Sequence, residues 1–204
     1  MGRYENVDLG LYEGVGEFQF PQVLPLYELP QIDNWIQFNY VKSTNKEKIK
    51  TGVNFYITDQ QFERVWNSPI RYTEVLSDYG AVIGPDFSTY LNFPKAMRVY
   101  NTFRNRWLTR FWQDRGLTVV PEVGWGLKDS WDWCFDGLPQ GSIVSVSNIG
   151  SMDSAEKRKN FKEGYNEMLK RLQPKEVLFY AHKIDDYAGP VHYIYFKMDK
   201  KTQS

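Results

Sequence analysis

The chain of 204 residues is 42% hydrophobic and 17% aromatic, which supplies enough apolar side chain for one domain and excludes disorder over most of its length. Its 25 basic and 25 acidic residues balance, so no overall field draws it to nucleic acid, and nonspecific DNA binding is not expected. The single Cys134 excludes an intramolecular disulfide, and no apolar run has the length of a signal-peptide core or a membrane span. We therefore expect a cytoplasmic protein without a membrane partner.

The N-terminal region is rich in residues that interrupt helices and strands. Residues 1–31 contain Gly10, Gly14, Gly16, Pro21, Pro25 and Pro30. Apolar residues between them, such as Phe18 and Phe20, predict an irregular arm that packs on the domain. We expect residues 32–197 to form a single α/β domain and residues 198–204 to form a flexible tail.

Short apolar segments alternate with helical ones in the first half of the chain. The pattern predicts strands over residues 35–41, 53–58 and 81–83. Asp59 is expected to cap a helix that runs toward Trp66, and a second short helix follows Pro69.

The same alternation continues in the second half. A long helix is predicted from Asn92, as its cap, to Gly116, and another from Ser154 to Leu172. A short helix is expected over residues 129–135. Strands are predicted over residues 117–121, 142–147, 176–181 and 191–196, the last of them antiparallel at an edge.

Strands separated by helices predict an α/β fold with a mostly parallel sheet. Five or six strand–helix units are too few for a complete eight-unit barrel of ordinary size, about 250 residues. Two architectures remain: a reduced or partly open TIM-type barrel and an open doubly wound sheet. We favour the barrel-like form because no strand is followed by a glycine-rich nucleotide-binding loop.

Polar side chains follow the predicted strands, and the carboxyl ends of parallel strands meet at one edge of a sheet. The residues at these ends are Asp59, Asp86, Ser88, Glu122, Trp125, Asn148, His182 and Lys183. We predict that Asp86, Glu122 and His182 are catalytic, because a carboxylate can orient a histidine or act as a base. The other five are predicted to bind substrate.

Simpler interpretations exist for the same residues. Asp59 and Asp86 stand just before predicted helices, where short acidic side chains cap exposed N–H groups. Clustered carboxylates can also hold Mg²⁺, although the sequence requires no cofactor. A zinc site is not expected, because the chain has only two histidines and Cys134 has no nearby ligand partner.

Each of two aromatic segments allows a ligand-binding interpretation beside a structural one. The segment RNRW (104–107) has the residues to bind phosphate and stack a base, but it fits better as a helix with Trp107 buried and its arginines solvated or paired. The segment WDWCFDG (131–137) fits a packed short helix, although Trp125, Trp131 and Trp133 are able to line a stacking pocket. Cys134 is expected to be buried rather than nucleophilic.

An ordered set of segments resembles a known family. The segments are PDFS, NTFRNRW, FWQDRGLTVVPEVGW, SWDWCFDGLPQGSIVSVS and GYNEMLKRLQPKEVLFY. Over roughly residues 50–182 they are similar to the domain-of-unknown-function family 4417, whose members come largely from bacteriophages and mobile elements. The resemblance implies a phage or mobile-element protein in the bacterial cytoplasm. It implies no established activity.

Two functions fit this setting. One is an enzyme that acts on a nucleotide, a nucleobase or a nucleic-acid-derived substrate by carboxylate and histidine acid–base chemistry at the strand ends. The other is a non-catalytic protein that sequesters a host defence protein or a signalling nucleotide, since aromatic residues and arginine are favoured in such interfaces. A structural part of the virion is a third and weaker interpretation.

Overall fold

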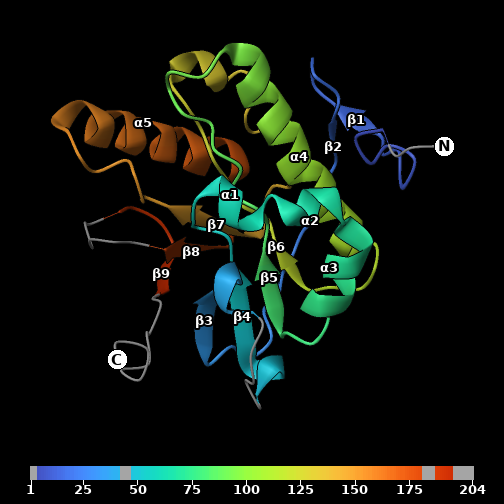
Figure 1. Cartoon of the computed structure of the whole chain (residues 1–204). Coiled ribbons are helices and arrows are strands. Elements are labelled where there is room, and N and C mark those ends of the chain that lie inside the picture. The colour runs from blue at the N-terminus through green and yellow to red at the C-terminus, as the bar shows by residue number, and fades with distance from the viewer. Residues whose placement is uncertain (1–3, 42–46, 181–186, 195–204) are drawn as a thin grey trace.

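The computed structural model describes residues 4–41, 47–180 and 187–194 of the chain (Figure 1). Two short strands, β1 (Gly14–Val15) and β2 (Phe20–Pro21), form an antiparallel hairpin. A four-stranded parallel sheet follows, in the order β3 (Asn34–Gln37), β4 (Thr51–Asn54), β5 (Ala81–Ile83) and β6 (Val119–Val120). A three-stranded parallel sheet consists of β7 (Ile143–Ser147), β8 (Glu176–Tyr180) and β9 (Val191–Ile194). A parallel bridge between Glu122 and Ser145 links the two sheets.

Helices occupy the connections between strands, which confirms the predicted α/β class with a parallel sheet. They are α1 (Asp59–Phe62), α2 (Arg64–Asn67), α3 (Pro69–Leu76), α4 (Lys95–Gln113) and α5 (Ala155–Leu172), with short 3₁₀ turns at Phe38–Tyr40, Lys48–Lys50 and Lys128–Ser130. Figure 1 shows α5 beside β7 and β8, while α1 to α4 lie on the side of β4 to β6. Of the described helices, none is both long and apolar enough to span a bilayer.

Alternate residues of each strand face opposite sides, as the two-residue period of a strand requires. On β5, Val82 packs toward the helices, whereas Ala81 and Ile83 face the other way. The side chains that face away from these helices form one cluster with members on β3, β5, β6, β7, β8 and β9. They are Trp35, Ala81, Ile83, Val120, Ile143, Leu178, Tyr180 and Ile194, together with Tyr56. A single inner core therefore includes residues of both sheets.

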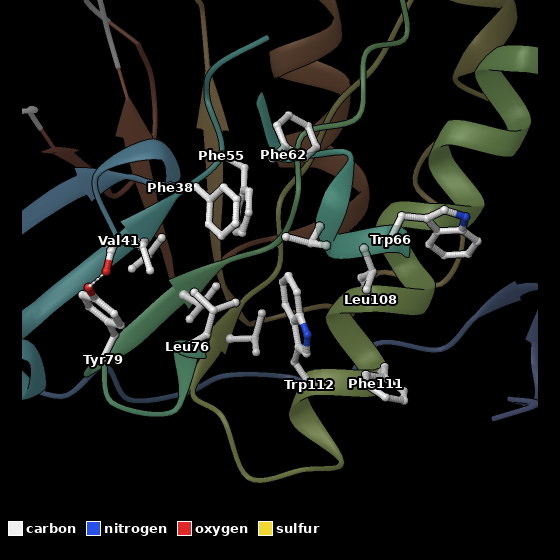
Figure 2. Packing of buried hydrophobic residues seen from close by; sticks show 14 of the residues in the cluster. Phe38, Val41, Phe55, Phe62, Trp66, Leu76, Tyr79, Leu108, Phe111 and Trp112 are labelled. Carbon is white, nitrogen blue, oxygen red and sulfur yellow. Dashed lines mark hydrogen bonds between the residues drawn. The ribbon is translucent and has the colours of Figure 1, made fainter. Parts of the chain in front are cut away.

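An aromatic core lies between the first sheet and helices α1 to α4 (Figure 2). The rings of Phe38 and Phe55 stack with centroids 4.8 Å apart, and Trp112 of α4 stacks on Phe55 at 5.8 Å. Tyr79 donates a hydrogen bond to the carbonyl of Val41, drawn as a dashed line in Figure 2. These contacts hold α4 against the sheet, and the polar residues of α4 thereby reach the strand ends.

The N-terminal segment contacts α4 and the turn at Gly137. Phe20 of β2 is fully buried, and the Val23 N–H donates to the carbonyl of Gly137. The indole of Trp107 on α4 donates to the carbonyl of Gly10 over 2.9 Å.

Several predicted elements differ from those observed. The strand at 35–41 ends at Gln37, because Phe38 begins a 3₁₀ turn that buries its ring. The strand predicted to reach residue 58 ends at Asn54, whose side-chain oxygen accepts the Tyr56 N–H. The helix predicted over residues 129–135 is reduced to the 3₁₀ turn Lys128–Ser130. In the first two cases a side chain enters the core or a turn because the backbone leaves strand geometry.

The prediction that the last strand is antiparallel was wrong. β9 pairs with β8 in parallel, with Tyr180 opposite Ile194. Only residues 181–190 separate the two strands, and parallel crossovers usually need a dozen or more residues, so the short connection favoured a hairpin. The described residues show no closed barrel.

Candidate functional site

A cavity of about 750 Å³ opens where strands β4 to β7 end. Its wall consists of segments that follow these four strands and of the N-terminal half of α5. Of the predicted site residues, Asp86, Ser88, Glu122 and Trp125 line it. The carboxyl ends of the strands therefore supply the wall, as parallel topology requires.

Glu122 is a buried carboxyl on this wall. It follows β6, and its side chain is 4% exposed. Burial and the nearby Asp86 raise its pKa well above the usual range, while Arg106 and a hydrogen bond from Asn105 act in the opposite direction. Asn105 Nδ2 lies 2.7 Å from Glu122 Oε2. Glu122 therefore holds a proton far more readily than an ordinary glutamate.

Asp86 is the second carboxyl of the wall. It follows β5 and Pro85 and is partly accessible through the cavity. Burial, and then the charge of Asp59, raise its pKa from 3.8 to about 7. An ideal Cβ placed on Gly124 would lie 3.3 Å from Glu122 Oε1 and 4.0 Å from Asp86 Oδ1. The two carboxyl groups thus border the same space beside Gly124.

Asn105 and Arg106 of α4 hold the strand ends in place. Asn105 Nδ2 also donates to the carbonyl of Pro85 over 2.7 Å, and its Oδ1 accepts from Arg106 Nη1 over 2.5 Å. Arg106 further donates to the carbonyls of Cys134 (2.7 Å) and Asp136 (3.2 Å). Burial lowers the Arg106 pKa to about 10, so the residue stays charged. Both arginines of the RNRW segment are buried and engaged inside the protein, as the structural interpretation expected.

Ser88 is held by two residues from other elements. Its hydroxyl donates to Asp59 Oδ1 over 2.7 Å, its N–H donates to the same carboxylate, and its carbonyl accepts from Asn101 Nδ2 over 2.6 Å. The prediction that Asp59 caps a helix was wrong, because Thr58 occupies the cap position and Asp59 is the first residue of α1. Asp59 instead positions the loop that carries Ser88.

Tyr56 is an aromatic wall residue that sequence reasoning missed. Its hydroxyl lies 2.8 Å from Ser145 Oγ, which donates its own proton to the carbonyl of Leu178. Ser145 therefore accepts, and Tyr56 donates. Burial, Glu122 and Asp86 raise the Tyr56 pKa well above its usual range. The phenol stays neutral beside the carboxyl pair.

Trp125 forms the opposite aromatic wall against α5. Its ring lies 5.0 Å from that of Phe161, and both residues line the cavity. A Cβ on Gly164 of α5 would come within 2.2 Å of Trp125 Nε1. The absence of a side chain at Gly164 thus lets the indole lie against the helix.

Gly164→Ala is expected to lower the free energy of unfolding by about 1 to 3 kcal/mol, the usual range for overpacking. In an unhindered helix the same change stabilises by up to about 1 kcal/mol, so the sign reports the clash with Trp125. Urea unfolding measures it. Asn166→Ala, at an exposed position of α5, is the control and should be neutral or stabilising. A stabilised Gly164→Ala protein would contradict the packing of Trp125 on Gly164.

The remaining predicted residues lie elsewhere. Asn148 is fully buried between Ser147 and Ile149, which line the cavity. His182 and Lys183 fall outside the described residues, and their roles stay predictions. The prediction of Asn92 as helix cap was wrong: Pro94 takes that position, and Asn92 lines the cavity.

The WDWCFDG segment packs into the core around α5. Trp131 and Trp133 belong to that core, so the stacking pocket contains Trp125 without them. Cys134 is buried, and burial raises its pKa to about 12, as expected for a structural cysteine.

Within the described ranges, no three histidine, cysteine or acidic side chains gather in a form that could hold a metal ion. A Mg²⁺ ion at this edge would have Asp86 and Glu122 as its carboxylate ligands.

Comparison with known proteins identifies the family. The family described as domain of unknown function (DUF4417) matches residues 12–196. The chain is 32% identical over 188 residues to the Gene 1 protein of Mycobacterium phage L5, covering 88% of this chain and 79% of that protein. It is 32% identical over 182 residues to the Gene 1 protein of Mycobacterium phage D29, covering 88% and 67%. No solved structure matches. The chain belongs to the DUF4417 family.

Proposed function

We propose that this protein is a phage or mobile-element accessory enzyme of the host cytoplasm that binds a nucleotide, nucleobase or nucleic-acid-derived substrate in the cavity. Asp86 and Glu122 transfer protons to and from that substrate. The observation that carries the proposal is the pair of carboxyl groups with raised pKa on the wall of one cavity. Such pKa values cluster at functional sites because acid–base catalysis needs groups that titrate near the working pH.

The surroundings of the pair fit this chemistry. Two carboxyl groups in environments that favour the protonated form can divide the roles of acid and base. The partly exposed ring of Trp125 lines the cavity and offers a face on which a base can stack. His182 follows β8 in the chain and remains a proposed third member of the catalytic set. Proton transfer at a glycosidic or phosphate bond is the reaction class that we propose.

We also propose that the sheet has the barrel-like form, reduced or partly open. The strands β3 to β9 follow one another in chain order, so five steps separate β3 from β8. A flat sheet would place these strands about 24 Å apart. Gln37 at the end of β3 nevertheless donates to the Tyr180 hydroxyl of β8 over 3.3 Å. The contact supports a sheet that curls around the inner core.

The proposed function is tested by incubating the protein with nucleosides, nucleotides and short single strands and analysing the products by liquid chromatography. We expect the wild type to release a base or a phosphate from one class. Glu122→Gln and Asp86→Asn should lower that rate at least a hundredfold, the typical contribution of a general acid or base. His182→Ala tests the third residue. A rate that survives both carboxyl substitutions would refute the proposal.

The rim of the cavity favours the alternative of a binding protein. Tyr90, Leu91 and Ile149 line the cavity and are 56%, 42% and 46% exposed. Exposed aromatic and aliphatic side chains around a pocket are typical of contact surfaces. A protein that sequesters a signalling nucleotide or a host defence protein would bind without releasing any product. Binding of a nucleotide, measured by NMR titration, with no product in the chromatographic assay would therefore favour the alternative.

A further inference from the structure

We propose that the carboxyl pair recognises a planar ring edge that carries an N–H donor beside a hydrogen-bond acceptor, such as the lactam edge of an oxo-nucleobase. Glu122 Oε1 donates to the acceptor of the ring, and Asp86 Oδ1 accepts its N–H. The proposal rests on the proposed function in one respect only, namely that Asp86 and Glu122 serve one site. It adds which carboxyl group donates and which accepts a hydrogen bond, and it adds the chemical class of the ligand.

The hydrogen bonds of α4 fix the orientation of the Asn105 amide. Arginine has only donors, so the Asn105 atom 2.5 Å from Arg106 Nη1 must be the oxygen. The amide nitrogen therefore faces Glu122 and donates to its Oε2 over 2.7 Å. In a protonated carboxyl group the carbonyl oxygen is the stronger acceptor, so the bond from Asn105 favours Oε2 as the carbonyl oxygen. When Glu122 is protonated, we therefore place its proton on Oε1.

Both carboxyl groups border the space beside Gly124. Of the Glu122 oxygens, Oε1 lies nearer to the position that a Gly124 Cβ would take, at 3.3 Å against 3.8 Å for Oε2, and Asp86 Oδ1 lies 4.0 Å from that position. All three residues line the cavity. Because glycine leaves this position empty, a flat ring edge can approach both oxygens from the cavity.

The charge of the pair selects the ligand. Burial raises both pKa values, and the Asp86 carboxylate further disfavours ionisation of Glu122, so Glu122 keeps its proton once Asp86 has lost its own. The pair then presents one donor and one acceptor. A phosphate or carboxylate group would meet negative charge here, and a purely apolar ring would leave both groups unpaired. Trp125, which is partly exposed and lines the cavity, adds an aromatic face for a planar ring.

The experiment compares 2-pyridone, which has an N–H beside a carbonyl, with N-methyl-2-pyridone, which lacks the donor. Binding to the full chain is titrated by NMR at pH 5 and pH 8, on either side of the Asp86 pKa of about 7. At pH 8 we expect the wild type to bind 2-pyridone at least tenfold more tightly than its methylated form, because the Asp86 carboxylate accepts the N–H. At pH 5, where Asp86 is protonated, the preference should shrink to threefold or less.

Two variants of Glu122 test the polarity directly. In Glu122→Gln the carbonyl can accept from Asn105, so the side-chain N–H takes the place of the Oε1 proton, and both probes should bind at pH 8 as they do to the wild type. In Glu122→Leu the donor to the ring carbonyl, which both probes carry, is gone, so both probes should bind at least tenfold more weakly at pH 8. Asp132→Asn, an exposed position away from the cavity, is the control and should match the wild type.

Equal binding of the two probes by the wild type at pH 8, or an unchanged affinity of folded Glu122→Leu protein for both probes, would overturn the inference. These results are distinct from a failure of the proposed function. A protein that prefers 2-pyridone but turns over no nucleoside, nucleotide or oligonucleotide retains the recognition and lacks the chemistry. A protein that turns over a substrate and shows no preference retains the chemistry and lacks this recognition.

Discussion

Asp86→Asn is expected to raise the free energy of unfolding at pH 8 by up to about 4 kcal/mol and to leave it nearly unchanged at pH 4. In the folded protein the pKa of Asp86 is raised to about 7, against an ordinary value of 3.8. Each tenfold change in proton affinity corresponds to about 1.4 kcal/mol. The folded state therefore binds this proton more tightly than the unfolded state does.

The sign of the pH dependence follows from linkage. Below about pH 4 the carboxyl is protonated in both states, and its burial as a neutral acid has little electrostatic cost. Between pH 4 and pH 7 unfolding releases the proton, so the wild type loses stability as the pH rises. Above pH 7 the full penalty is present. Asparagine has no such penalty, so the difference in the free energy of unfolding between Asp86→Asn and the wild type grows from pH 4 to pH 7.

Urea unfolding between pH 4 and pH 9 measures the effect. Asp132→Asn changes the same functional group at an exposed position and should show a small difference that does not vary with pH. A constant difference for Asp86→Asn, or a loss of stability at pH 8, would contradict the raised pKa. A confirmed gain would mean that the native sequence keeps a destabilising charge at the cavity, which is typical of sites retained for function.

The parts of the fold that the sequence predicted best are those in which local pattern and packing agree. Residues 81–83 form β5 as predicted, and the apolar stripe of residues 154–172 forms α5 with Ser154 as its cap. The boundaries of β3 and the direction of β9 were missed. Both depend on tertiary contacts, the burial of the Phe38 ring and the register of β9 on β8, which no short window of sequence contains.

Sequence alone predicted only those residues of the candidate site whose place follows from the order of the strands. Asp86 and Glu122 follow strands, so the rule for parallel sheets predicted that they lie near each other. Asn105 and Gly124 were missed, because their importance comes from the side chains opposite them. One signal was available: Asn105 stands three residues before Leu108 and seven before Trp112, on the helix face that these apolar residues bury, so its amide had to be buried and paired.

Arg106→Leu is expected to lower the free energy of unfolding by about 3 to 5 kcal/mol, the range for removing one member of a buried charged network. The Arg106 side chain is among the largest that are fully buried in the described part of the chain. Without it, the carbonyls of Cys134 and Asp136 and the Asn105 oxygen lose their donors. Chemical unfolding at pH 7 measures the loss. Lys48→Ala, which removes an exposed ion pair with Asp78, is the control and should change stability by less than about 1 kcal/mol.

A double variant separates the two roles of Arg106. If Arg106 serves mainly to neutralise Glu122, then adding Glu122→Gln to Arg106→Leu should restore most of the lost stability. The contacts indicate a different result, because Arg106 donates to backbone carbonyls of the segment after η3 (Lys128–Ser130) and touches Glu122 only at its carbonyl, over 3.4 Å. We therefore expect the double variant to regain less than half of the loss. Full recovery would show that charge balance, rather than the attachment of α4 to that segment, is what Arg106 provides.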